Sequence, residues 1–432
     1  MKNTKLFQYV VMGLFVFFLL VGAILFSTYR SSNSALTNIS ITMWGTLPVE
    51  SFNSFVSNYF SDSDLKYTVN YTEKDPATFD RDLVEALASG SGPDTIILPE
   101  DFIVRYYNKI YPIPYNILPE ATFKDTFIQE GELYLNSSGV LALPLMVDPL
   151  VMYWNRDIFN NAGVTNPPTD WAQVSSLVPR MTKLDKAQNV ITSTIALGEY
   201  RNINNSKSIL SALFIQAGNP IVSLDSSGSL NSKLKDVVNP DSSSALALQF
   251  YTNFSNPNKA EYSWNRSLPN SLDFFANGDS AIYLGFTSEY MAIKNKNPNL
   301  NFEVALLPQA VGARTYSTFG NMLGLAIMKN SANPAGAFTV ISSLSSAAAF
   351  SYWKDIFNLP SARKDSVPDI SNSVAKTIFN RSAVRSKGWY DPNSAQTSAI
   401  FQDMIESYTT GRETLDGVIN TASERLDSLL NN

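Results

Sequence analysis

Carboxylates and aromatic rings are the side chains of this sequence that could form a site, because the chain contains no His and no Cys. Their absence excludes disulfides, thiolate nucleophiles, imidazole bases, Ser-His-Asp triads and the His or Cys ligands that most zinc sites use. Lys, Tyr and carboxylates remain for chemistry, together with any hard cation that carboxylates could hold. We expect neither a cofactor nor a metal site.

Three acids stand at positions where a ligand could reach them. Asp101 follows a predicted strand at 95–98, Glu199 follows one at 191–197, and Asp148 lies where the chain is predicted to cross between two lobes. Ligands of open α/β sheets bind beyond the carboxyl ends of the strands, which favours a site. A structural interpretation stays open for each acid: a helix cap for Asp101, a plain turn for Asp148 and a solvated loop for Glu199.

Aromatic residues and one Gly-Asn pair are the other candidates. They are Trp44, Tyr200, Phe286 and Trp389, with Gly320 and Asn321. Trp44 ends a predicted strand at 39–44, and Phe286 follows one at 280–284. Core packing explains these two equally well, and a hinge turn explains the Gly-Asn pair nearly as well.

Residues 140–163 separate one predicted lobe from the next. Pro144 and the pair Asp148-Pro149 interrupt an apolar run, which predicts a strand, a break and a second strand. Because Pro cannot donate to a sheet ladder, we interpret the break at Asp148 as a crossing segment and not as part of a central strand. A short helix then ends at Gly163.

The segment before this division alternates strands and helices. Strands are predicted at 39–44, 67–71 and 95–98, and apolar residues such as Phe52, Phe55 and Val56 recur between them at helical spacing. Short connections between such elements predict a parallel sheet covered by helices. The remainder continues with mixed helices and strands and ends in two helices.

Length, charge and the N-terminus restrict the class of protein. A chain of 432 residues is too long for one ordinary core, and its net charge of −6 argues against nucleic acid as the partner. Two lysines precede an uncharged run at 6–29, whose core at 10–26 fits a membrane span better than a signal-peptide core. The lysines place the N-terminus in the cytoplasm and the rest outside. A cleaved signal peptide is the alternative.

The chain resembles the extracellular solute-binding proteins of ABC importers, specifically the sugar-binding group that includes maltose-binding proteins. The resemblance covers nearly all of 38–432. Its carriers are LASGSGPDTIIL (87–98), ALPLMVDPLVMYWNRDIFNNAGVTNPPTDWAQV (142–174), FFANGDSAIYLGF (274–286), the series from LLPQ to NPAGAF (306–338), LPSA (359–362) and TSAIFQDMIESYTTG (397–411). Six motifs in this order are a strong signal.

The resemblance implies a two-lobed α/β fold of the periplasmic-binding-protein type II class, with a ligand cleft between the lobes. The apolar run at 6–29 adds an N-terminal transmembrane helix to this prediction. The implied division is an anchor and tether at 1–37, lobe 1 at 38–146, lobe 2 at 147–308, a return to lobe 1 at 309–356 and a return to lobe 2 at 357–432. Carried over by position, Asp101, Asp148, Glu199, Tyr200 and Phe286 would contact the ligand. Trp389 lies in a region that supplies a stacking aromatic.

The function that this implies is capture of a sugar or oligosaccharide outside the membrane and its delivery to permease subunits of an ABC transporter, by a monomer. Flat rings would bind the C–H faces of the sugar, and carboxylates or amides its hydroxyls. Two departures from the family stand out: Leu98, where maltose binders have an aromatic, and the missing lipid-bearing Cys. A solute-sensing receptor and a glycoside hydrolase with two carboxylates are the alternatives.

Overall fold

The computed structural model describes residues 38–61, 66–235, 244–367 and 373–431. The apolar run at 6–29 that is predicted to span a membrane lies outside these residues. None of the helices in the described ranges is both long enough and apolar enough to cross a membrane.

Most strands belong to one mixed sheet. They are β1 (Asn38–Gly45), β2 (Lys66–Glu73), β3 (Thr95–Pro99), β6 (Leu143–Asn155), β7 (Lys183–Leu184), β8 (Val190–Ile195), β11 (Ser280–Phe286), β12 (Phe302–Ala305), β13 (Thr318–Ile327) and β14 (Ser386–Lys387). Their order is β2-β1-β3-β13-β6-β11-β8-β7, with β12 beside β6 and β14 beside β13. Two short hairpins stand apart: β4 (Leu135–Asn136) with β5 (Gly139–Val140), and β9 (Val222–Leu224) with β10 (Leu230–Ser232).

Helices cover this sheet on both lobes. They are α2 (Val49–Ser61), α3 (Phe79–Ser89), α4 (Ile103–Tyr106), α5 (Glu120–Thr126), α6 (Arg156–Asn161), α7 (Trp171–Met181), α8 (Ser206–Gln216), α9 (Ser244–Asn253), α10 (Ser271–Ala276), α11 (Glu289–Lys296), α12 (Pro334–Leu344), α13 (Ala347–Phe357), α14 (Val374–Ala383), α15 (Ser394–Thr409) and α16 (Leu415–Leu430). Within the described ranges, the 3-10 turns are η2 (Glu100–Phe102), η3 (Gln129–Tyr134) and η5 (Lys364–Ser366).

The predicted parallel unit at the start of the chain is confirmed. β1 pairs in parallel with β2 on one side and with β3 on the other. α2 buries Phe52, Phe55 and Val56, the apolar positions at helical spacing, against this sheet. The carboxyl ends of β1 and β3 therefore lie at the same edge, as ligand sites of such sheets require.

The predicted break at Asp148 is wrong, because β6 is one continuous strand in the centre of the sheet. It pairs antiparallel with β13 from Leu143 to Pro149, and with β11 from Leu150 onward. Pro144 lies where the register to β13 shifts, and Pro149 is the last residue paired with β13 before β11 takes over. Bulges and changes of partner tolerate a missing N–H, which is why two prolines do not end this strand.

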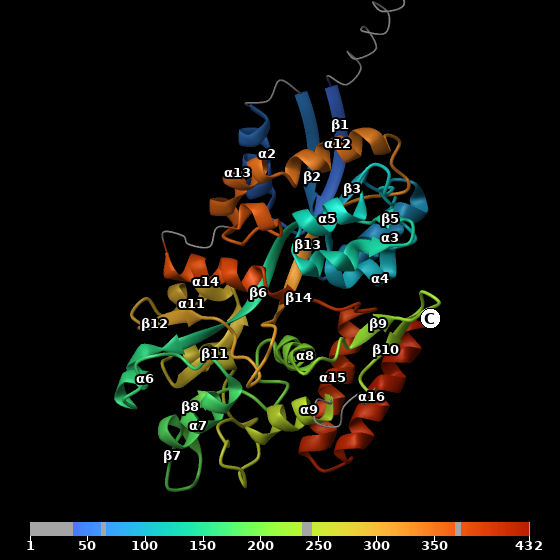
Figure 1. The fold of residues 1–432 in the computed structure, drawn as a ribbon. Coiled ribbons are helices and arrows are strands. Elements are labelled where there is room, and N and C mark those ends of the chain that lie inside the picture. Colours follow the sequence, from blue (N-terminus) through green and yellow to red (C-terminus); the bar gives the residue numbers. More distant parts are fainter. Residues whose placement is uncertain (1–37, 62–65, 236–243, 368–372, 432) are drawn as a thin grey trace, which may run out of the picture.

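Two groups of cores define two lobes, which Figure 1 shows as separate groups of elements joined by β6, β13 and β14. We call lobe 1 the part whose cores include Ile41 and Leu98, and lobe 2 the part whose cores include Ile282 and Phe401. β6 serves both, because its first half packs in lobe 1 and its second half in lobe 2. The exact lobe boundaries proposed from the sequence stay a prediction.

Candidate functional site

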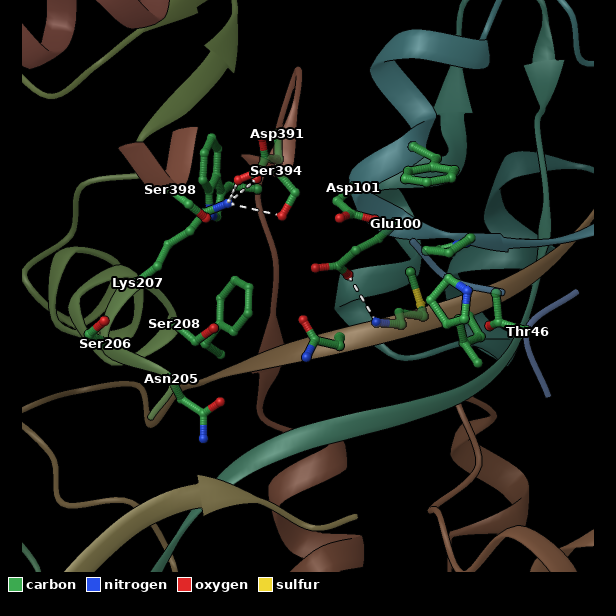
Figure 2. A pocket seen from close by; sticks show the side chains of 18 of the residues that line it. Thr46, Glu100, Asp101, Asn205, Ser206, Lys207, Ser208, Asp391, Ser394 and Ser398 are labelled. Carbon is green, nitrogen blue, oxygen red and sulfur yellow. Dashed lines mark hydrogen bonds and ion pairs between the residues drawn. The ribbon is translucent and has the colours of Figure 1, made fainter. Parts of the chain in front are cut away.

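A cavity of about 560 Å³ lies between the two lobes, and Figure 2 shows it from close by. Lobe 1 lines it with the ends of β1 and β3, lobe 2 with the start of α8 and the segment at 389–398, and β13 contributes the middle. The polar side chains that line it are Thr46, Glu100, Asp101, Asn205, Ser206, Lys207, Ser208, Asn321, Asp391, Ser394 and Ser398. The aromatic ones are Phe79, Phe102, Tyr200, Phe319 and Trp389.

On the lobe 1 side, the cavity wall begins where β3 ends. Pro99 is extended and is followed by the 3-10 turn η2, which brings Glu100 and Asp101 into the cavity. Burial raises the pKa of the Asp101 carboxyl, and the Asp391 carboxylate across the cavity raises it further. Lys207 and the Ser394 hydroxyl act in the opposite direction. The pKa of Asp101 in lobe 1 therefore depends on charged groups of lobe 2.

On the lobe 2 side, Lys207 in the first turn of α8 connects the segments that form the cavity wall. Its Nζ donates to Asp391 Oδ2 at 2.5 Å and to Thr397 Oγ1 at 2.7 Å. It also lies 5.5 Å from the centre of the Trp389 ring. Asp391 is 5% exposed, so this ion pair is largely removed from water. The pair ties α8 to the start of α15, although the two are far apart in sequence.

The sequence predicted nine site residues, and four of them line the cavity. These are Asp101, Tyr200, Asn321 and Trp389. Asn321 is exposed on β13, Tyr200 is half-buried against the core of lobe 2, and Trp389 is 3% exposed. The four come from separate segments of the chain, which the fold brings around one space.

Two of the other predicted residues are fixed by protein contacts near the crossing. Asp148 accepts hydrogen bonds from Thr287 Oγ1 at 2.7 Å and from the Ser288 backbone N–H at 3.0 Å, and burial raises its pKa. Phe286 is buried and meets Phe319 edge to face at 6.4 Å. Phe319 lines the cavity, so Phe286 lies behind the lining residue. Asp148 connects β6 to the segment that follows β11.

Trp44 and Glu199 also lie outside the cavity lining. Trp44 is half-buried against a core of lobe 1, and the Lys74 ammonium lies 3.8 Å from its ring centre. Glu199 is 7% exposed, and its carboxylate accepts from the Arg266 guanidinium at 3.2 Å. A structural role accounts for the contacts of both residues.

Gly320 is buried on β13 where no side chain fits. A Cβ atom there would lie 1.9 Å from Ser386 Oγ, 2.6 Å from Glu130 Oε2 and 2.9 Å from Val147 Cγ2. Gly320→Ala should therefore lower the free energy of unfolding by about 1–3 kcal/mol, the usual cost of overpacking. Urea denaturation checks this. Gly417→Ala in the first turn of α16 is the control: its Cβ atom would lie 3.1 Å from its nearest neighbour, Thr414 Oγ1, so it should change the free energy of unfolding less than Gly320→Ala does. Equal effects at both positions would contradict the close packing at Gly320.

Sequence reasoning missed the charged residues Glu100, Lys207 and Asp391. Glu100 directly precedes Asp101, and both follow β3, so the end of the strand was a usable signal for either acid. Asp391 begins the Asp-Pro-Asn-Ser run that leads to the N-cap Asn393 of α15. Lys207 offered no signal, because its role depends on a partner from the other end of the chain.

Comparisons with known proteins agree with this architecture. A family model described as "Bacterial extracellular solute-binding protein" matches residues 46–349, well over half of the chain. Curated binding proteins of Brucella abortus (strain 2308) and Brucella suis biovar 1 (strain 1330) are 26% identical over 98 residues, which are 22% of this chain and 23% of each relative. The match thus spans less than a quarter of the length of these relatives.

Solved structures are similar over nearly their whole length. The cyclic α-maltosyl-1,6-maltose binding protein of Arthrobacter globiformis is 15% identical with a TM-score of 0.74, covering 91% of this chain and 100% of its own. The sugar-binding protein MalE of Xanthomonas citri is 17% identical with a TM-score of 0.72, covering 91% and 97%. A solute-binding protein of Thermotoga lettingae, bound with α-D-tagatose, is 18% identical with a TM-score of 0.64, covering 91% and 100%. At these identities the likeness shows the two-lobed α/β fold.

Proposed function

Because this chain belongs to the bacterial extracellular solute-binding protein family, we propose that it captures a sugar or oligosaccharide between its two lobes and delivers it to the permease of an ABC transporter. It would act as a monomer on the outer side of the membrane, tethered by its N-terminal apolar run at 6–29. Asp101, Tyr200, Asn321 and Trp389 are the proposed contacts of the ligand.

The observation that carries this proposal is the composition of the interlobe cavity. Its volume of about 560 Å³ falls within the roughly 300–1,000 Å³ that is usual for small-molecule sites. It combines aromatic side chains with carboxyl, amide and hydroxyl groups, as recognition of sugar rings and their hydroxyls requires. The solved relatives, whose names refer to tagatose or maltose-type saccharides, support a saccharide ligand here.

Capture follows from the contribution of both lobes. A ligand that contacts Asp101 in lobe 1 and Tyr200 in lobe 2 binds the closed arrangement more tightly than an open one. Only such differential affinity shifts the equilibrium between the two arrangements. Closure around the ligand would then present a different surface to the permease.

The test is thermal unfolding of the full chain in the presence of single sugars, including D-tagatose, maltotetraose and acarbose. A ligand that binds only the folded state stabilises it by RT ln(1 + [L]/Kd), about 2.7 kcal/mol at 100 times Kd. We expect a rise of several degrees with at least one sugar, and recovery of that sugar unchanged after incubation. Conversion of the sugar, or no shift with any sugar of a broad panel, would overturn the proposal.

Asn321→Ala should weaken this binding without weakening the fold. Asn321 is exposed on β13 within the cavity, so we expect a stability change within about 0.5 kcal/mol. Loss of its hydrogen bonds to the ligand should raise Kd by roughly 5–100-fold. Isothermal titration calorimetry checks this against Asn295→Ala, an exposed Asn on α11 outside the cavity lining. Equal Kd values for the two variants would remove Asn321 from the site.

A further inference from the structure

Two glutamates form a buried acid pair behind the lobe 1 wall of the cavity. Glu100 belongs to η2 and lines the cavity, and Glu130 belongs to η3. Glu100 is 6% exposed and Glu130 only 2%. Both carboxyls border β13 two residues apart: Glu100 Oε2 accepts from the Met322 N–H, and a Cβ atom at Gly320 would lie 2.6 Å from Glu130 Oε2. The placement of Glu100 and Glu130 therefore also affects the shape of the lobe 1 wall, together with Asp101 and Asn321.

The pair is packed tightly between lobe 1 and the segments that lead to lobe 2. The Met322 backbone N–H on β13 donates to Glu100 Oε2 at 3.2 Å. A Cβ atom at Gly388 would lie 2.7 Å from Glu100 Oε1, and one at Gly320 would lie 2.6 Å from Glu130 Oε2. At both positions only a residue without a side chain leaves room for the acids. The two glycines belong to β13 and to the segment after β14, which connect the lobes. Any separation of the two carboxyls must displace one of these segments.

Two ionised carboxylates in this place would be very unfavourable. An ionised carboxylate without a compensating partner is costly to bury, and two of them repel each other. Neither oxygen of Glu130 has a hydrogen-bond partner among the described residues. One proton on the pair supplies the missing donor and removes one charge. In agreement, burial raises the pKa of both glutamates, and the neighbouring Glu130 raises that of Glu100 further.

The groups around the pair act on that proton in both directions. Asp101 is the next acid in the chain and raises the pKa of Glu100 again. The Tyr134 hydroxyl is committed to the backbone oxygens of Leu98 and Met322, at 3.0 and 3.3 Å. Ser386 lowers the pKa of Glu130. Two lysines, Lys124 and Lys387, line a separate hollow of about 340 Å³ that Glu130 also borders.

We propose that Glu130 is a positioning residue for the ligand site: it shares one proton with Glu100, and only this singly protonated pair holds η2 where Glu100 and Asp101 face the ligand. Loss of the proton drives the two carboxylates apart and moves the lobe 1 wall. Capture is thereby coupled to one proton and weakens as the pH rises. The shared proton is inferred from the structure alone, whereas its effect on ligand binding rests on the proposed sugar capture.

The first consequence concerns the ligand-free protein. The unfolded chain releases this proton near pH 4.3, the ordinary value for Glu, whereas the folded chain keeps it to higher pH. Folded protein thus binds more protons, and stability falls as the pH rises through the pKa of the pair. The midpoint temperature of thermal unfolding of the full wild-type chain should therefore decrease as the pH rises above about 4.3. In Glu130→Gln, which keeps the shape and cannot ionise, this fall should be markedly smaller.

Glu132→Gln is the matched control, because Glu132 lies on the same turn but is partly exposed and paired with Lys124 at 3.6 Å. It should keep the wild-type dependence on pH. Glu100→Gln removes the same proton from the other side and replaces Glu130→Gln if that variant does not fold. Identical pH profiles for the wild type and both pair variants would overturn the proposal.

The second consequence concerns the ligand. For any sugar that stabilises the wild type, Kd should rise by up to about tenfold per pH unit above the pKa of the pair, the limit for one linked proton. The Kd of Glu130→Gln should be nearly independent of pH over the same range. If no sugar binds, the proposed function fails, yet the unfolding profiles still decide whether the pair shares a proton. If a sugar binds with the same pH dependence in Glu130→Gln, the positioning role is wrong.

Discussion

Replacing Lys207 with methionine should lower the free energy of unfolding by about 3–5 kcal/mol. The side chains of Lys207 and Asp391 are only 15% and 6% exposed, so removal of the lysine leaves a buried carboxylate without its cation. Breaking a buried ion pair from one side typically costs this much, because the remaining charge stays desolvated. Thr397 would retain its hydrogen bond to Asp391 and offset part of the loss. Urea denaturation followed by circular dichroism measures the effect.

The double variant Lys207→Met with Asp391→Asn separates the pair from the packing around it. With both charges gone, no unpaired charge is left in the buried site, so much of the stability should return. A double variant that is less stable than Lys207→Met alone would show that the lysine acts mainly through packing. The surface pair of Arg425 with Asp403, both about half exposed, serves as reference: Arg425→Met should cost less than about 1 kcal/mol.

Trp389→Ala should have an effect of similar size, about 3–5 kcal/mol, and should also abolish binding of the sugar. The ring is 3% exposed and stacks on Phe401 with centroids 6.1 Å apart and an interplanar angle of 17°. Removing so large a buried side chain leaves a cavity that the core of lobe 2 cannot fill. Lys207 would lose its cation–π contact to the ring as well.

Trp389→Phe distinguishes the two roles of this ring. Phenylalanine keeps the stacking on Phe401 and most of the buried area, so the loss of stability should be about half or less. If Trp389→Phe is stable and still loses the ligand, the indole ring contacts the sugar. If both variants lose stability and bind the sugar at low temperature with unchanged Kd, Trp389 belongs to the core alone.

Local patterns in the sequence predicted much of the fold. The alternation of strands and helices before residue 100 is confirmed, because short connections leave few topologies for such a unit. β6 was the main error. Pro144 and Pro149 suggested a break, but a register shift and a change of neighbouring strand provide the two places where a missing N–H does no harm. The sequence pattern does not show which strands will lie on either side of β6.

The sequence predicted four residues that line the cavity, and Asn321, within β13, is one that does not follow a strand. Asp101 could be found from the end of β3, and it lines the cavity. Lys207 and Glu130 could not, because the role of each depends on a partner that the fold brings from a distant segment, Asp391 in one case and Glu100 in the other. In the sequence alone, a glutamate that the fold will bury cannot be distinguished from one that stays on the surface.

The position of β13 decides the order in which the chain can fold. This strand lies between β3 and β6, pairing Ile327 with Thr95 on one side and Leu325 with Leu143 on the other. A growing chain that has reached β12 already contains both neighbours but leaves their edges unpaired. Contacts between such distant segments form slowly. Lobe 1 therefore stays incomplete until most of the chain has been made.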